Sequence, residues 1–263
     1  MWIVKIGGGD GINAEGIIRD LAGRKEPVIL LHGANAARDR LAAALGIEKE
    51  TVTSVSGYSS VFSDERVIDL QMMAYAGLRN KRIVETAQRH GLNAVGLSGL
   101  DGRAVQGKRN AGIRVREGGK TLMRRDLSGK PQSVNEELLR LLLDHGYTPV
   151  LCVPIADENG FAINSENDDI LTVVQNALRA EKIFQFIEAP GFLDRKEDPG
   201  SLVKTITRAE LAAREDQVEG RMKRKMLALR NLFEGGAATV MIADGRTAHP
   251  VKDALAGKGT LIQ

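Results

Sequence analysis

The sequence predicts an α/β fold in which parallel strands are joined by helices and β-hairpins are inserted. Over the first 100 residues, apolar runs of strand length alternate with amphipathic stretches of helix length, which is typical of a parallel sheet. Between residues 102 and 130 the pattern changes to short polar, β-prone pieces broken by glycines, which favours antiparallel hairpins. At 263 residues, 43% of them hydrophobic, the chain can bury the core of one large domain or of two lobes.

The first half of the chain is expected to contain three strands and the helices that connect them. Ser63 precedes two acidic residues, which predicts that it caps a helix over Glu65–Arg79, whose apolar residues recur at helical spacing. A further helix is expected at Lys81–His90. The other elements, in chain order, are a strand at Ile3–Ile6, a helix at Ala14–Gly23, a strand at Pro27–His32, a helix at Arg38–Leu45 and a strand at Ala94–Leu97.

The alternation of helices and strands resumes after the hairpins. A soft boundary near Asn176–Lys182 is expected to divide the chain into an N-terminal lobe of residues 1–176 and a C-terminal lobe of residues 177–263. The expected elements are a helix at Ser133–His145, a strand at Thr148–Val153, a turn at Asp157–Gly160, a helix from near Asn167, a strand at Lys182–Ile187, helices at Arg208–Glu215 and Met222–Glu234, and strands at Thr239–Ile242 and Gly259–Ile262.

Composition narrows the class of protein. Cys152 is the single cysteine and lies in an apolar run, so a disulfide within the chain is impossible and a reducing cytoplasm is expected. A secretory leader and an apolar run of roughly 20 residues are both missing, so secretion and membrane insertion are not expected. The net charge is +3, and basic residues crowd the stretch from Lys108 to Arg125, as in a solvated hairpin or a surface for an acidic partner. No aromatic residue is interleaved with these charges, so nucleic acid is not an expected partner.

The ends of the predicted strands carry the first candidate site. Lys5 is followed by Gly7-Gly8-Gly9, which would offer an ammonium and bare backbone N–H groups to a phosphate oxygen. Gly33-Ala34-Asn35 ends the next strand, and neighbouring parallel strands share one crevice at their carboxyl ends. Ser98–Gly102, at the end of a third strand, is a further candidate for that opening. Neither the full Walker A motif GxxxxGK[ST] nor GxGxxG occurs, which argues against a P-loop NTPase and a nicotinamide dehydrogenase.

Two later clusters carry the remaining charge that phosphoryl transfer needs. Asp168, in the run Asn164–Asp169, is either a plain helix-capping acid or a carboxylate that positions lysines. The run Gly220–Lys225 places cations at the start of a helix, where they oppose the helix dipole unless an anion binds there. Two lysines, backbone N–H groups and one organising acid would suffice for transfer from magnesium ATP. His32 is expected to be structural, and the four histidines form no metal-ligand pattern.

At these motifs the chain resembles the amino acid kinase family, and within it the acetylglutamate kinase branch, over essentially its whole length. The similarity is greater still to the LysW-aminoadipate and LysW-glutamate kinases, which phosphorylate the terminal carboxylate of an amino acid held on the acidic carrier protein LysW. The resemblance implies a three-layer αβα sandwich with a mainly parallel central sheet. The residues that carry it are Lys5-Ile6-Gly7-Gly8, Leu31-His32-Gly33-Ala34, Asn164 with Asp168, and Gly220-Arg221-Met222-Lys223-Arg224-Lys225, together with Gly11-Ile12-Asn13, Asn80-Lys81-Arg82 and Leu97–Gly102 for the LysW subgroup.

The resemblance also implies roles for individual residues. Lys5 and Lys225 would stabilise the transferring phosphoryl group, and Asp168 would orient both lysines. The backbone N–H groups of Gly8, Gly33 and Ala34 would hold acceptor and phosphoryl oxygens, and Asn164 would contact the amino acid. Gly220 and Lys223 would bind ATP together with Lys5 and Lys225.

The same resemblance implies ATP bound by the C-terminal half, Mg²⁺ with no protein metal ligands, and a cytoplasmic homodimer formed through the helix at Glu65–Arg79. The basic hairpins between Lys108 and Arg125 would meet an acidic amino-group carrier protein like LysW. The expected reaction is ATP-dependent phosphorylation of the side-chain carboxylate of carrier-bound α-aminoadipate or glutamate in lysine or arginine biosynthesis.

Two departures from the family pattern leave alternatives open. Relatives place an arginine about where Val61 falls, to bind the substrate's α-carboxylate, and this chain has none in residues 57–64. Ala34 replaces the second glycine of the usual His-Gly-Gly, which narrows the allowed backbone conformations. The alternatives are a kinase for free N-acetylglutamate, a carboxylate kinase for another amino acid, and a sensor of nucleotides or amino acids without catalysis.

Overall fold

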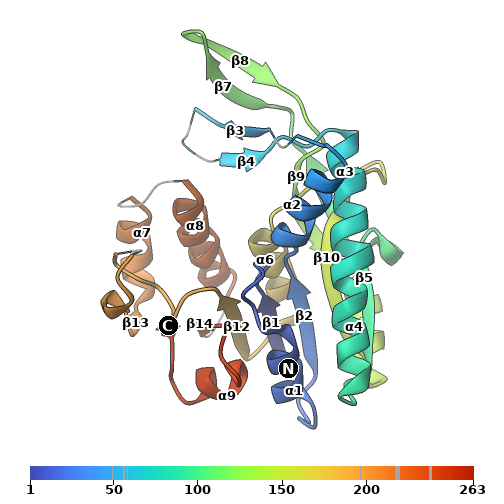
Figure 1. Cartoon of the computed structure of the whole chain (residues 1–263), viewed down its shortest axis with the longest axis vertical. Helices are drawn as coiled ribbons and strands as arrows, with labels where there is room; N and C mark the ends of the chain where they lie inside the picture. Colours follow the sequence, from blue (N-terminus) through green and yellow to red (C-terminus); the bar gives the residue numbers. More distant parts are fainter. Residues whose placement is uncertain (49, 56, 58, 196, 217–219, 237–238) are drawn as a thin grey trace.

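The computed structural model describes residues 1–48, 50–55, 57, 59–195, 197–216, 220–236 and 239–263, and helices cover both faces of its central sheet (Figure 1). Most neighbouring strands of this sheet run parallel, as predicted. Within the described residues the strands are, in spatial order, β13 (Thr205–Ile206), β15 (Thr260–Ile262), β14 (Val240–Asp244), β12 (Lys182–Ile187), β1 (Trp2–Ile6), β2 (Val28–His32), β10 (Thr148–Ala156), β6 (Val105–Arg109) and β9 (Gly129–Val134), with β5 (Ala94–Gly99) and β11 (Ala162–Ile163) also paired to β10.

Two apolar clusters, one on each face of the sheet, form the core. One cluster joins the strands to α1 (Ala14–Leu21), α4 (Asn80–Arg89) and α9 (Pro250–Leu255). The other joins them to helices of the opposite layer, which are α2 (Asn35–Ala44), α5 (Glu136–Asp144), α6 (Asn167–Leu178), α7 (Arg208–Asp216) and α8 (Gly220–Glu234). The αβα sandwich expected from the sequence is therefore confirmed.

The central position of β1 decides where Lys5 points. Trp2, Val4 and Ile6 belong to the cluster with α1, and Ile3 belongs to the cluster with α6 and α8. Because side chains alternate along a strand, Lys5 shares the face of Ile3. Its register partners are Leu31 on β2 and Gln185 on β12, so the lysine lies in the middle of the sheet, under α6 and α8.

The long helix on the edge of the molecule differs from the prediction in its start and in its continuity. Its cap is Asp64 rather than Ser63, because the Asp64 carboxylate accepts the Val67 N–H at 2.9 Å and Ser63 is buried. The helix is unbroken from residue 65 to residue 89, although two helices were expected, because a π-helical segment, η1 (Met72–Arg79), joins α3 (Glu65–Gln71) to α4. Such segments occur often at functional sites.

Two hairpins project from the top of the molecule in Figure 1. One of them lies between residues 102 and 130, where the sequence predicted hairpins. The pair β7 (Ile113–Glu117) and β8 (Lys120–Arg124) is antiparallel, and so is the pair β6 and β9. A second small hairpin, β3 (Thr51–Thr53) with β4 (Ser59–Val61), was not predicted. An isolated bridge between Ser54 and Val115 joins the two projecting hairpins.

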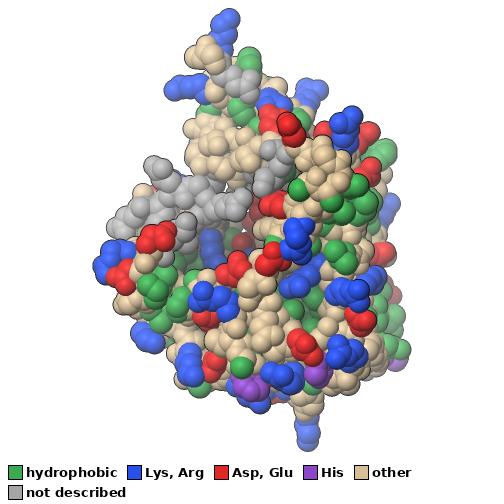
Figure 2. Space-filling model, viewed as in Figure 1, with side chains coloured by type: hydrophobic (Ala, Val, Ile, Leu, Met, Phe, Trp, Pro, Cys, Tyr) green, Lys and Arg blue, Asp and Glu red, His purple; other side chains and the backbone are tan. Residues whose placement is uncertain are grey.

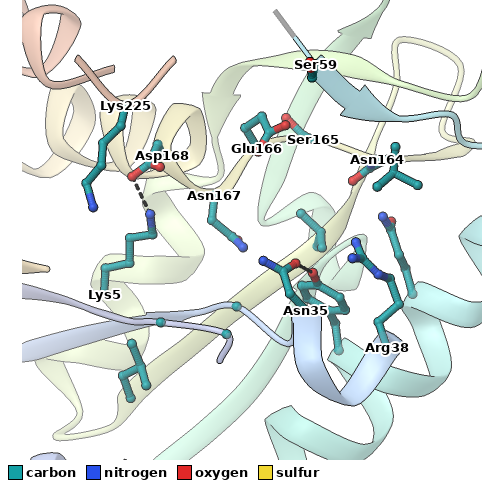
Figure 3. A pocket seen from close by; sticks show the side chains of 18 of the residues that line it. Lys5, Asn35, Arg38, Ser59, Asn164, Ser165, Glu166, Asn167, Asp168 and Lys225 are labelled. Carbon is teal, nitrogen blue, oxygen red and sulfur yellow. Dashed lines mark hydrogen bonds and ion pairs between the residues drawn. The ribbon is translucent and has the colours of Figure 1, made fainter. Parts of the chain in front are cut away.

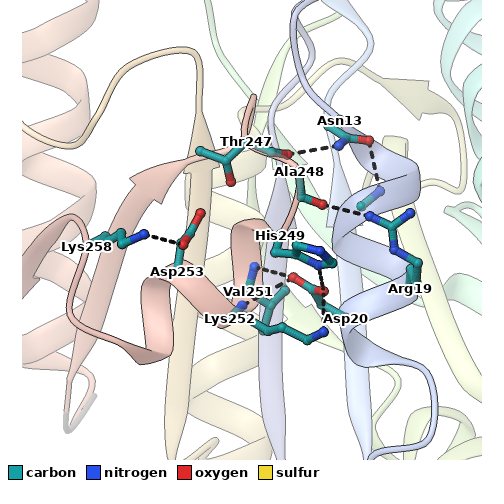
Figure 4. Close-up of polar contacts among 11 residues, drawn as sticks. Asn13, Arg19, Asp20, Thr247, Ala248, His249, Val251, Lys252, Asp253 and Lys258 are labelled. Atoms are coloured by element: carbon teal, nitrogen blue, oxygen red, sulfur yellow. Dashed lines mark hydrogen bonds and ion pairs between the residues drawn. The ribbon is translucent and has the colours of Figure 1, made fainter.

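The C-terminal elements follow the prediction closely, except for the two-residue strand β13 and the helix α9, which were not predicted. α9 is held by α1 (Figure 4): the buried Asp20 carboxylate accepts the backbone N–H groups of Val251 and Lys252 at 3.1 and 3.2 Å and the His249 ring at 2.9 Å. A carboxylate from another helix thus takes the place of a local cap. The contact fastens the last elements of the chain to the first helix.

Two further points complete the fold. The predicted lobe boundary between residues 176 and 177 falls inside α6, and the sheet is continuous across it through the β1–β12 pairing, so the division into lobes stays a prediction. In the part of the chain that the structure describes, no helix is both long enough and apolar enough to cross a membrane. The short 3₁₀ turns are η2 (Asp101–Arg103) and η3 (Pro199–Ser201).

Candidate functional site

A pocket with a cavity volume of about 300 Å³ opens at the carboxyl ends of β1, β2 and β10. Strands, helices and loops from both halves of the chain supply its polar walls, and Figure 3 shows their side chains converging on it. Sequence motifs from both halves of the chain meet here, as expected of the crevice at the carboxyl ends of parallel strands. The lining residues are Lys5, Ile6, Gly7, Gly8, Gly33, Asn35, Arg38, Thr51, Ser59, Val61, Gln71, Tyr75, Val153, Asn164, Ser165, Glu166, Asn167, Asp168 and Lys225.

Three charged side chains gather at one end of this pocket. The Lys5 ammonium forms an ion pair with the Asp168 carboxylate, and both groups are partly buried. Asp168 lies in the first turn of α6, and Lys225 reaches toward the same carboxylate from α8 (Figure 3). The acid therefore faces two lysines that come from opposite ends of the sequence, which is the juxtaposition expected from the motifs.

The electrostatics of this end are those of an anion site. Burial lowers the pKa of Lys225 to about 8; nearby Lys5 also lowers it, while Asp168 raises it. Two ammonium groups with one carboxylate between them leave a net positive charge that a phosphoryl group can neutralise. The arrangement can hold developing negative charge on a transferred phosphoryl group from two sides.

The two glycine loops lie against each other, and this contact explains the need for glycine. A Cβ at Gly8 would lie 2.7 Å from the backbone nitrogens of Ala34 and Asn35, and a Cβ at Gly33 would lie 2.9 Å from the nitrogen of Gly8. Ala34 fits where relatives have glycine because its φ is −146°, which any residue adopts. It is buried and is not one of the lining residues.

The hydrogen bonds of these loops change one expectation. The N–H of Gly33 donates to the Ile6 carbonyl at 2.9 Å, so it continues the sheet and is not available to a phosphoryl oxygen. The part that Gly33 plays is to let its backbone pack closely against that of Gly8. Asn35 opens α2 and lines the pocket, and the N-terminus of a helix attracts anions.

Of the other residues expected at the site, one lines the pocket and two do not. Asn164 lines it, and its Nδ2 donates to Ser63 Oγ at 2.9 Å, which fixes the direction of the amide. Gly220 begins α8, and Lys223 is partly buried; neither belongs to the pocket lining. Two residues along a helix is a rotation of about 200°, so Lys223 lies on the face of α8 opposite to Lys225.

Two further sequence expectations can be compared with the structure. The Ser98–Gly102 loop does not line the pocket, so that expectation is wrong; Asp101 instead accepts the Ser98 N–H at 2.6 Å and folds the loop on itself. The structural role predicted for His32 is confirmed. Burial lowers the pKa of His32 to about 3, and its neutral ring lies between the Gly33 carbonyl and the Asn80 amide, at 3.3 and 3.1 Å.

The structure adds lining residues that the motifs did not reveal. Tyr75, in the π-helical segment, donates to Asn35 Oδ1, so the Asn35 Nδ2 is directed away from the tyrosine. Burial raises the pKa of Tyr75 to about 12, which keeps the donor proton in place. Arg38 and Gln71 also line the pocket although no motif includes them. The sequence placed Arg38 at the start of a helix, but the structure starts that helix at Asn35, which brings both residues to the same face.

Comparisons with known proteins agree with this geometry. The model of the amino acid kinase family matches residues 1–244. A [LysW]-aminoadipate kinase from Deinococcus radiodurans is 41% identical and covers 100% of this chain and 91% of its own, and one from Thermus thermophilus is 38% identical with 100% of both chains covered.

Solved structures show the same fold at low identity. An N-acetylglutamate synthase from Neisseria gonorrhoeae has a TM-score of 0.79 at 21% identity; the match covers 99% of this chain, which spans only 58% of that longer one. A carbamate kinase from Giardia has a TM-score of 0.65 at 15% identity over 99% of this chain and 97% of its own. Since the family model and full-length relatives both cover the residues that build the pocket, the chain belongs to the amino acid kinase family.

Proposed function

We propose that the protein is an ATP-dependent kinase that phosphorylates the side-chain carboxylate of α-aminoadipate, or of glutamate, held on an acidic amino-group carrier protein, in lysine or arginine biosynthesis. The observation that carries the proposal is the meeting of Lys5, Asp168 and Lys225 at one end of a polar pocket. The two full-length relatives named [LysW]-aminoadipate kinase support the choice of acceptor.

In the proposed reaction a carboxylate oxygen of the acceptor attacks the γ-phosphorus of ATP. The new bond is P–O to the carboxylate, and the bond from the γ-phosphorus to the bridging oxygen breaks, so that ADP leaves with that electron pair. Lys5 and Lys225 neutralise the charge that spreads over the phosphoryl oxygens, and Asp168 keeps both ammonium groups facing it. The backbone N–H groups of Gly8 and Asn35 are the donors proposed for the oxygens between the glycine loops.

The nucleotide is proposed to bind on the side of α8 and the C-terminal strands, with the start of α8 at Gly220 toward its phosphates. Lys223 lies on the face of α8 opposite to Lys225, so the ATP contact expected for Lys223 is not part of the proposal. Among the described residues no group of three His, Cys, Asp or Glu side chains could hold a metal ion. Magnesium is therefore proposed to enter as part of the MgATP substrate, whose phosphate oxygens hold it and whose charge it reduces.

The hairpin of β7 and β8 suits an acidic carrier. It presents exposed Arg114, Arg116 and Lys120, and beside them exposed Leu122 and Met123 (Figure 2 shows the blue tip). Basic and apolar side chains together are what a docking surface for an acidic protein needs. The bridge from this hairpin to residue 54 connects it with β3 and β4, whose residues form the rim of the pocket, so a docked carrier would hold its amino acid over the opening.

We also propose that the enzyme is a cytoplasmic homodimer. The long helix from residue 65 to residue 89 presents Met73 and Leu78, 45% and 50% exposed, on its outer surface. Sedimentation equilibrium of the wild type and of Leu78→Glu tests this assembly, because a buried carboxylate at the contact would shift a dimer toward monomer.

The reaction is tested by hydroxylamine trapping of the acyl phosphate together with ADP release. Carrier-bound aminoadipate, carrier-bound glutamate and free N-acetylglutamate are compared side by side. Signal with the carrier-bound acids alone supports the proposal. Signal with free N-acetylglutamate would show that the reaction does not need a carrier; this alternative stays open because the loop at Val61 has no arginine. Absence of signal with all three acceptors would contradict the assignment.

A further inference from the structure

The end of the pocket away from Lys5 and Lys225 carries a second set of polar groups, of which only Asn164 has a role so far, the contact with the amino acid that the family resemblance implies. Figure 3 shows Arg38 and Asn164 at this end and Lys5, Asp168 and Lys225 at the other. An acceptor that places its reacting carboxylate beside the lysines extends toward Arg38. The chemistry of this far end therefore decides which part of the acceptor is recognised.

Arg38 is a buried guanidinium that faces the pocket. It is only 6% exposed, and its Nε and Nη2 both donate to the neighbouring Asp39 at 2.9 and 2.8 Å. In the described part of the chain, Nη1 has no recorded partner. The Asp39 carboxylate takes the edge of the guanidinium formed by Nε and Nη2, so a ligand carboxylate would bind at the Nη1 edge.

Gln71 provides a second, independent observation at the same end. It is the last residue of α3, is 1% exposed and lines the pocket. Its Oε1 is buried without a hydrogen-bond partner among the described residues. A buried amide oxygen left without a donor is costly, so this atom indicates a ligand that brings an N–H group.

Val61 lies beside Arg38 and carries no charge. Both residues line the main pocket and also an adjoining small cavity. The loop position at which relatives have an arginine is thus occupied here by a side chain that cannot bind a carboxylate, while a guanidinium reaches the same region from α2. A planar guanidinium can bind a carboxylate through two parallel hydrogen bonds from any element that aims it correctly.

We propose that Arg38 binds the second carboxylate of the acceptor, the one that is not phosphorylated, and that Gln71 Oε1 accepts the acceptor's amide N–H. The proposal rests on the proposed function, because it takes for granted an amino acid with two carboxylates and an acylated nitrogen. Arg38 is then the specificity residue for the α-carboxylate, and the arginine function has moved from the loop to α2.

The test compares two acceptors on the same carrier: α-aminoadipate, and 5-aminopentanoate, which lacks only the α-carboxylate. In the wild type, loss of this carboxylate should raise KM about 10- to 100-fold, the range for one charge-assisted pair. In Arg38→Met, the two acceptors should have KM values within about threefold of each other, with kcat changed far less than KM. Arg40→Met is the matched control, because Arg40 lies on the same helix, is exposed, pairs with Asp10 and is outside the pocket lining.

Two further variants make the outcome decisive. Arg38→Lys keeps the charge without the fork and should discriminate less than the wild type; it replaces Arg38→Met if that variant fails to fold. Adding Val61→Arg to Arg38→Met should restore part of the preference for aminoadipate. Gln71→Leu should raise KM for both acceptors equally, since both have the amide.

Unchanged discrimination in folded Arg38 variants would overturn the inference while leaving the proposed function intact. A wild type that phosphorylates neither acceptor would instead contradict the proposed function itself, so the two failures are distinguishable.

Discussion

Lys225→Met should make the protein more stable and nearly inactive, and the two effects follow from the same burial. The lysine is half-buried at one end of the pocket, and this desolvation lowers its pKa to about 8 from 10.5. A group whose charged form is disfavoured by folding reduces stability wherever it stays protonated. Methionine has a similar unbranched side chain, so it fills the space without the charge.

The magnitude follows from the shift. One pKa unit corresponds to about 1.4 kcal/mol, so the change from 10.5 to about 8 corresponds to about 3 kcal/mol of stability at pH 7. Between pH 8 and pH 10.5 the unfolded chain binds more protons at this lysine than the folded one, so the wild type gains stability as pH rises through that window. The advantage of Lys225→Met over the wild type should therefore be full below pH 8 and disappear above pH 10.5.

Urea unfolding at pH 7 and pH 10.5 measures the stability difference, and hydroxylamine trapping measures turnover. The expected kcat loss is at least about 100-fold, because the lysine acts on charge present only during transfer. Lys223→Met is the matched control on the same helix, outside the pocket lining, and should not change stability with pH in this way. A Lys225→Met protein that is less stable than the wild type at both pH values would refute the burial argument, and one that keeps full turnover would refute the catalytic role.

Three other variants test separate parts of the site. Asp168→Asn should lower kcat about 100-fold and move the alkaline loss of activity to lower pH, because the carboxylate raises the pKa of Lys225; a pH–rate profile that does not move would contradict this. Gly8→Ala should cost about 1–3 kcal/mol and most of the turnover, because the new Cβ would lie 2.7 Å from the next loop's nitrogens; thermal melting and kinetics with normal values would show that the loops are not in contact. Asn80→Ala should cost about 1–3 kcal/mol of unfolding free energy with kcat unchanged, since its buried amide bonds to His32 and Val150 away from the pocket; a large kcat loss without destabilisation would show that His32 takes part in the reaction.

The catalytic end of the site could be predicted because its parts are short motifs at strand and helix ends. Lys5 is fixed by a short apolar strand that ends in glycines, and Asp168 by a helix start. Parallel strands bring their carboxyl ends to one edge whatever the intervening sequence, so the prediction that the two glycine loops share a crevice needed no contact information. The meeting of Lys5 with Asp168 and Lys225 was implied by the family resemblance alone. The strands expected at Ile3–Ile6 and Lys182–Ile187 were confirmed almost residue by residue, because each is a short apolar run with clear ends.

The errors fall where hydrogen bonds between distant residues decide the outcome. Gly33 has the sequence of a phosphate-binding glycine, yet its N–H continues the sheet by donating to Ile6. Ser63 precedes a helix like a cap, but Asp64 caps the helix and Ser63 instead holds Asn164. α9 was missed because its N–H groups are satisfied by Asp20, more than 200 residues away in the chain.

The residues at the far end of the pocket could not be predicted from the sequence, for a more general reason. Arg38 and Gln71 lie in the interiors of helices, where a side chain's direction is set by the packing of α2 against the long helix rather than by neighbouring residues. The transfer chemistry constrains Lys5, Asp168 and Lys225 in position and kind, because the phosphoryl group is the same for every acceptor. A carboxylate clamp needs only a guanidinium aimed at one point, which several elements can supply. Acceptor recognition is therefore less tied to one element than the catalytic motifs are, and here the uncharged Val61 lies next to the buried Arg38 that we propose for this role.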